Sequence, residues 1–108
     1  MLDVTDETFA TEVLASRVPV IVDFWAPWCT PCDAIEPHLR TIAETNADRV
    51  RLVRLDVDAN LAVPGRYAVL SLPTVILFAD GVAQVTVYGA HGRARYEHEF
   101  APWLEEIS

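Results

Sequence analysis

The segment at residues 19–25 constrains the fold most strongly, because it is an almost unbroken apolar run. The β-branched side chains of Val20, Ile21 and Val22 favour an extended conformation. A strand that is apolar on both faces has to be covered on both faces, which is typical of the central strand of an α/β sheet. Asp23 is the one charged residue in this run.

Apolar periodicity along the rest of the 108-residue chain predicts four more strands and four helices, in one domain over residues 1–108. Thr5 offers an N-cap for the first helix, and Asp80-Gly81 predicts an antiparallel hairpin. Pro37 and Pro102 lie within helical patterns and should kink or divide those helices. The alternation of predicted strands and helices along the chain predicts an α/β fold with helices on both faces of a mixed sheet. The strands are expected at residues 2–4, 50–57, 74–78 and 82–88, and the helices at 5–16, 29–45, 60–67 and 96–107.

The charge balance argues against two classes of partner. Sixteen acidic residues against eight basic ones give a net charge of -8, which repels phosphate backbones and anionic lipid surfaces. We therefore expect no nucleic-acid and no membrane partner. No apolar stretch is long enough to cross a bilayer, and residues 1–7 lack the basic start and apolar run of a secretory signal. A cytoplasmic location is expected.

The only two cysteines, Cys29 and Cys32, lie between the predicted central strand and a predicted helix. A zinc site needs about four ligands, and His38, His91 and His98 show no close ligand spacing, so no metal site is expected. A structural disulfide is a second interpretation, but so short a loop constrains the unfolded chain little. A redox pair is the third, because a thiol at a helix N-terminus faces unsatisfied N–H groups that stabilise its thiolate. Cys29, on the open side of the turn, would attack, and Cys32 would resolve.

The ten residues 23–32, Asp-Phe-Trp-Ala-Pro-Trp-Cys-Thr-Pro-Cys, resemble the active-site strand and loop of thioredoxins. The resemblance continues along the chain at Pro37, residues 56–58, residues 71–74, Phe78, Gly81 and Gly89. It implies a thioredoxin fold, in which a central mixed five-stranded sheet is flanked by four helices.

The same resemblance implies roles for individual residues. Cys29 and Cys32 would form a redox disulfide and reduce protein disulfides through a mixed-disulfide intermediate. Asp23 would lie behind the disulfide with a raised pKa and accept the proton of Cys32. A cis bond before Pro73 would turn the backbone of Leu72 toward the sulfurs. The residues expected to bind substrate around Cys29 are Trp28, Thr30, Pro31, Leu72, Pro73, Tyr88, Gly89 and Ala90.

Partners also follow from the resemblance. A flavin-dependent thioredoxin reductase would restore the dithiol, with NADPH as the ultimate donor, and the clients would be proteins that contain disulfides. The chain itself would need no cofactor and would be a monomer. Two alternatives stay open at this point: a disulfide oxidase or isomerase, and a binding module with little redox activity.

Among the residues that depart from the common thioredoxin pattern, three are expected to modulate the site. Thr30 stands where most members carry glycine, and its β-branched side chain should stiffen the turn. Asp33 stands where many members carry a cation, so its charge should oppose a Cys29 thiolate. Arg54 stands where the family often has lysine. If its guanidinium reaches Asp23, it should hold that carboxylate ionised.

Overall fold

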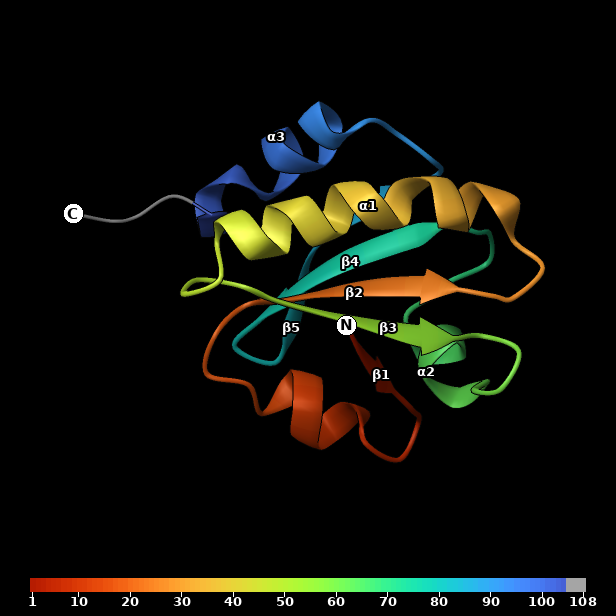
Figure 1. Cartoon of the computed structure of the whole chain (residues 1–108). Coiled ribbons are helices and arrows are strands. Elements are labelled where there is room, and N and C mark those ends of the chain that lie inside the picture. The colour runs from red at the N-terminus through yellow and green to blue at the C-terminus, as the bar shows by residue number, and fades with distance from the viewer. Residues whose placement is uncertain (105–108) are drawn as a thin grey trace.

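The computed structural model describes residues 1–104 and contains a five-stranded mixed sheet in the order β1-β3-β2-β4-β5 (Figure 1). Strands β1, β3 and β2 are mutually parallel, whereas β4 is antiparallel to β2 and β5 is antiparallel to β4. The strand predicted to be central is β2, and it lies in the middle of the sheet. The strands are β1 (Leu2–Val4), β2 (Val20–Trp25), β3 (Arg51–Asp56), β4 (Thr74–Ala79) and β5 (Val82–Tyr88).

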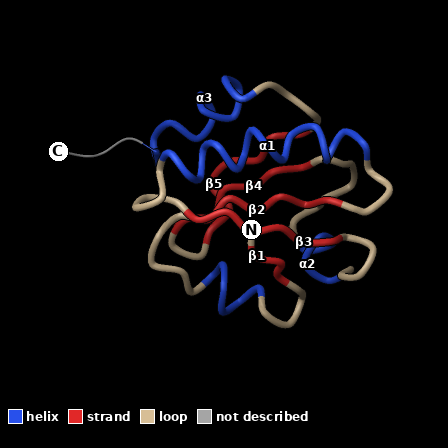
Figure 2. Tube along the Cα trace, viewed as in Figure 1, coloured by secondary structure: helices blue, strands red, loops and turns tan. Residues whose placement is uncertain are grey.

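Helices cover both faces of the sheet, which confirms the predicted fold class. Figure 2 shows α1 and α3 on one side, with α2 and the N-terminal helix on the other. The helices are η1 (Ala10–Leu14), α1 (Thr30–Thr45), α2 (Ala62–Arg66) and α3 (Arg93–Leu104). Both α1 and α3 continue past their internal prolines, so neither helix is divided. Ile107, which the sequence pattern included in the last helix, lies outside the described residues.

Within residues 1–104, no helix combines the length and the apolar character that crossing a membrane requires.

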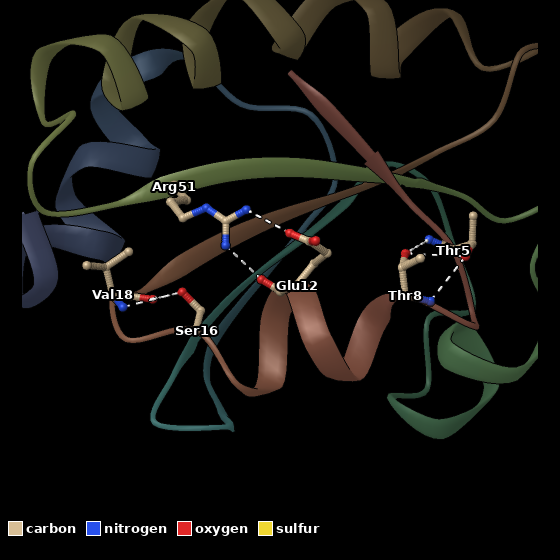
Figure 3. Close-up of polar contacts among 6 residues, drawn as sticks. All are labelled: Thr5, Thr8, Glu12, Ser16, Val18 and Arg51. Carbon is tan, nitrogen blue, oxygen red and sulfur yellow. Dashed lines mark hydrogen bonds and ion pairs between the residues drawn. The ribbon is translucent and has the colours of Figure 1, made fainter.

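The first helix differs most from its prediction. Thr5 and Thr8 form a reciprocal pair in the turn before it, in which the Thr5 hydroxyl accepts the Thr8 N–H at 3.2 Å and the Thr8 hydroxyl accepts the Thr5 N–H at 2.8 Å (Figure 3). The predicted N-cap at Thr5 is therefore wrong, because the N-cap residue of the helix is Phe9 and no side chain caps it. The helix itself is a short π-helix, in which the Ala15 N–H donates to the Ala10 carbonyl at 2.9 Å, and such helices are usually about one turn long.

Alternation along β2 directs its side chains into two cores. Val22 and Phe24 pack with Phe9 in the core beneath η1 and α2. Ile21 packs in the core beneath α1 and α3. Because successive strand residues point to opposite faces, Asp23 lies on the same face as Ile21, toward α1. The central strand therefore carries a carboxylate into one of the two apolar layers.

A single arginine ties η1 to β3, two elements that are distant in sequence. The Arg51 guanidinium donates to the Glu12 carbonyl at 2.9 Å and pairs with the Glu12 carboxylate at 3.1 Å (Figure 3). The side chains of the pair are only partly exposed, at 38% and 37%. The hydrogen bond to the carbonyl also satisfies a backbone acceptor of the helix.

Replacing Arg51 by alanine should lower the free energy of unfolding by about 1 kcal/mol, because both bonds to Glu12 are lost from a partly exposed site. Denaturant unfolding measures this change. The exposed Arg66 of α2 offers a matched control, and Arg66→Ala should change stability less. Equal losses in the two variants would contradict the anchoring role of Arg51.

Candidate active site

The two cysteines lie at the junction between β2 and α1. The strand ends at Trp25, and Cys29 is the N-cap residue of the helix. The ends of β2 and β3 and the start of α1 lie at the same end of the sheet (Figure 1). Pro31 lies in the first turn of α1, where its missing N–H costs no helical hydrogen bond. The pair thus begins a helix directly after a buried strand, as the sequence predicts.

Cys29 and Cys32 form a disulfide, and their Cα atoms are 5.3 Å apart. The two residues are 3% and 2% exposed, so exposure does not separate an attacking sulfur from a resolving one. A hydrogen bond does separate them, because the Cys32 backbone N–H donates to the Cys29 sulfur at 3.3 Å. The Cys29 sulfur is therefore the one that lies at the positive end of α1.

The loop before β4 closes over the disulfide. Leu72 is partly buried and packs against the apolar cluster that contains the two cysteines. The Leu72–Pro73 bond is cis, as the resemblance implied. The Pro73 carbonyl accepts the Gly89 N–H at 2.9 Å, and Thr74 pairs with Tyr88 across the hairpin. This part of the expected substrate surface is thus assembled from three connected pieces of chain.

Exposed residues surround this nearly buried pair. Trp28 is 66% exposed and Tyr88 57% exposed, so neither serves mainly as core. Thr30, Pro31 and Ala90 are also exposed. The predicted binding residues therefore combine buried sulfurs with accessible apolar and backbone groups, an arrangement that suits a protein substrate more than a small ion.

Two supporting contacts were not foreseen from the sequence. The Trp28 indole Nε1 donates to an oxygen of Asp58 at 2.7 Å, which fixes the exposed ring. The hydroxyl of the buried Tyr96 donates to the Gly89 carbonyl at 3.2 Å. The sequence could have indicated a role for Asp58, since this residue follows the end of a strand that terminates at the site. It could not have indicated one for Tyr96, because the helical spacing of Tyr96 predicts only a core position.

Asp23 is a buried polar residue of β2, two positions before the end of the strand that leads to the cysteines. It is 2% exposed, and its Oδ1 has no hydrogen-bond partner among the residues that the structure describes. Burial raises the pKa of Asp23 to about 7, the negative charge of Glu36 adds to the rise, and the positive charge of Arg54 opposes it. A carboxyl with this pKa can bind or release a proton near neutral pH.

Arg54 does not hold Asp23 ionised, because its guanidinium is engaged elsewhere. Its Nε donates to Asp3 at 2.6 Å, and its Nη1 lies 3.7 Å from a Glu36 oxygen. The same group lies over the ring of Trp25, 4.3 Å from the ring centroid. The condition on which the predicted ionisation depended is therefore not met.

Two further polar residues border the site. Asp33 is exposed in the first turn of α1. A ring nitrogen of His91, for which the sequence predicts no role, lies 2.8 Å from the Tyr88 carbonyl. Among residues 1–104 no three histidine, cysteine or acidic side chains gather as a metal site would require.

Known proteins that resemble this chain in sequence are named as thioredoxins. The chain matches the Thioredoxin family model over residues 1–102. It is 47% identical over 87 residues to Thioredoxin 1 of Synechococcus elongatus, covering 81% of each chain. It is 44% identical over 107 residues to Thioredoxin of Mycobacterium tuberculosis, covering 99% of this chain and 92% of that one. A further relative is the Bifunctional thioredoxin reductase/thioredoxin of Mycobacterium leprae, 42% identical over 93 residues, which are 86% of this chain and 20% of that protein.

The raised pKa of Asp23 predicts a pH-dependent gain in stability for Asp23→Asn. Between the unfolded pKa of 3.8 and the folded pKa of about 7, ionisation favours the unfolded chain, so stability falls as pH rises. The variant lacks this penalty. Its gain should be absent near about pH 3 and reach at most about 4 kcal/mol near about pH 8. Denaturant unfolding at both pH values measures it, with Asp48→Asn, at an exposed loop position, as control. A gain independent of pH would contradict the prediction.

A second prediction concerns Asp33. Because Asp33→Asn removes a negative charge one turn from the N-cap, the Cys29 thiolate should form at lower pH than in the native protein. The ultraviolet absorbance of the thiolate and the rate of alkylation, followed against pH in the reduced protein, report this change. Asp33→Glu keeps the charge and should behave as the native chain. A thiolate that forms at the same or a higher pH in Asp33→Asn would overturn the prediction.

Proposed function

Since the chain belongs to the thioredoxin family and is a thiol-disulfide oxidoreductase, we propose that Cys29 is the nucleophile and Cys32 the resolving thiol of its protein-disulfide reductase activity. The observation that carries this assignment is the N–H of Cys32 aimed at the Cys29 sulfur from the start of α1. A thiolate at that position is stabilised by the hydrogen bond and by the helix dipole. No such donor faces the Cys32 sulfur in the described contacts of residues 1–104.

The reaction starts from the reduced pair. The Cys29 thiolate attacks one sulfur of a client disulfide, forms a mixed disulfide and releases the other client sulfur as a thiolate. The Cys32 thiol then loses its proton, and its sulfur attacks Cys29. This second step releases the remaining client thiolate and forms the Cys29–Cys32 disulfide. Two electrons pass from the protein dithiol to the client disulfide.

Asp23 is proposed as the acceptor of the Cys32 proton. Its burial, its free Oδ1 and its pKa of about 7 support that role, because a base is most effective when its pKa is near the working pH. A carboxylate with an ordinary pKa would be a weaker base. In this proposal Asp23 supplies what the second step requires, a group able to take a proton at neutral pH.

The exposed surface around the disulfide is proposed as the client-binding site. Its support is the exposure of Trp28 and Tyr88 beside buried sulfurs, together with the partly buried Leu72 packed against them. An extended client segment can pair its backbone with the loop while its side chains contact the apolar rim. The residues assigned to this surface are Trp28, Thr30, Pro31, Leu72, Pro73, Tyr88, Gly89 and Ala90.

A thioredoxin reductase is the proposed electron donor. One relative is named as a fusion of thioredoxin reductase and thioredoxin, which supports pairing of the two activities. We propose that the reductase is a flavoprotein that draws on NADPH, and that the chain works as a cytoplasmic monomer with one domain over residues 1–108. The oxidase or isomerase alternative and the binding-module alternative are not favoured, because the relatives are thioredoxins over most of the chain.

Insulin reduction coupled to NADPH oxidation tests this proposal. With a flavin-dependent thioredoxin reductase present, the chain should accelerate NADPH consumption and insulin precipitation, and Cys29→Ser should abolish both because the attacking sulfur is gone. Cys32→Ser should instead accumulate a mixed disulfide with the client, visible by mass spectrometry. Activity retained in Cys29→Ser, or a trapped adduct on Cys32 alone, would reverse the assigned roles.

A further inference from the structure

Three charged residues form a row across neighbouring parallel strands. In the sheet register, Arg54 of β3 pairs with Asp3 of β1 on one side and with Asp23 of β2 on the other. Partners in such a register point to the same face and lie about 5 Å apart. Arg54 is therefore flanked by two carboxylates, one on the edge strand and one on the central strand.

The structure shows which of the two carboxylates Arg54 contacts. Its Nε donates to the Asp3 carboxylate at 2.6 Å, and its Nη1 lies 3.7 Å from Glu36 of α1. The guanidinium also lies over the ring of Trp25, which limits its position. The hydrogen bond to Asp3 is the main cause that raises the pKa of Arg54. The ion pair with Asp3 draws the positive charge toward the edge strand β1, and the contacts with Glu36 and Trp25 occupy the rest of the guanidinium without a hydrogen bond to Asp23.

Few titratable groups surround Asp23. The groups that face it are Glu36 from α1, Arg54 from β3 and Tyr96 from α3, while β4 places the apolar Val75 beside it. Burial, and to a smaller extent the charge of Asp23, raise the pKa of Tyr96, so this phenol is neutral near neutral pH. Arg54 is thus the only cation in this set.

We propose that Asp3 and Glu36 are positioning residues that hold the Arg54 guanidinium away from Asp23 and leave that carboxyl unpaired for the proton of Cys32. The inference rests on the proposed role of Asp23. Glu36 also acts on Asp23 through its own charge, whereas Asp3 lies on the far side of Arg54. Asp3 is not among the charges that shift the pKa of Asp23, so its main influence on that carboxyl runs through the arginine, which makes it the diagnostic position.

Asp3→Asn should lower the pKa of Asp23 by about one unit or more, because the released guanidinium can approach the buried carboxylate. Carbon-13 NMR of the Asp23 carboxyl, titrated in the disulfide form, measures this shift without interference from a thiol. Glu7→Gln removes an exposed acidic charge from the same N-terminal segment and should leave the Asp23 titration unchanged.

A double-mutant cycle isolates the part played by Arg54. In an Arg54→Gln background, Asp3→Asn should no longer move the pKa of Asp23, whereas Glu36→Gln should still lower it through the loss of its own charge, by less than with Arg54 present. An unchanged pKa in Asp3→Asn alone, or an equal shift with and without Arg54, would overturn the proposal.

Stopped-flow reaction of the reduced protein with an aryl disulfide that releases a coloured thiolate separates this inference from the proposed role of Asp23. The first phase reports attack by Cys29 and the second reports resolution by Cys32. The acid limb of the second phase should move to lower pH in Asp3→Asn together with the Asp23 titration. If the Asp23 pKa falls while this limb stays, the positioning by Asp3 holds and the role of Asp23 as proton acceptor fails.

Discussion

Burial of β2 on both faces is the constraint on which the rest of the structure depends. Because the strand is covered by helices on each side, it lies in the centre of the sheet, and its end at Trp25 leads directly into the N-cap of α1. The same burial removes Asp23 from water, which is the main cause of its raised pKa. One apolar segment therefore sets the position of the disulfide and the proton affinity of the carboxyl that the strand carries.

Local patterns account for what was predicted correctly. The run Val20, Ile21 and Val22 predicts a central strand because β-branched apolar residues fit a surface covered on both sides. Asp80 and Gly81 predict the hairpin because both adopt positive φ angles, 54° and 75°, as a tight turn of the matching hand requires. The order of helices and strands then follows, since each segment has its own pattern of apolar residues and turn residues. The family resemblance added the cis bond before Pro73, which no local pattern favours.

Contacts between distant segments account for what was missed. The sequence suggested only Asp23 as a partner for Arg54, and nothing in it shows that Asp3, 51 residues away, is the partner at 2.6 Å. The bond from Trp28 to Asp58 likewise joins residues 30 positions apart. For the two cysteines, whose roles were predicted from the position of Cys29 on the open side of the turn, the structure replaces exposure with a backbone hydrogen bond as the feature that distinguishes the sulfurs. Such pairings depend on the register between strands and on how helices pack against the sheet. The apolar periodicity of the sequence determines neither of these.

The hydrogen bond from Tyr96 to Gly89 gives α3 a second task. The ring is buried between the helix and the sheet, while its hydroxyl donates to the backbone of Gly89, in the loop proposed to bind clients. The helix that covers one face of the sheet therefore also supports this loop from inside the molecule. If the loop binds clients as proposed, a change in the packing of α3 could alter client preference without changing any exposed residue.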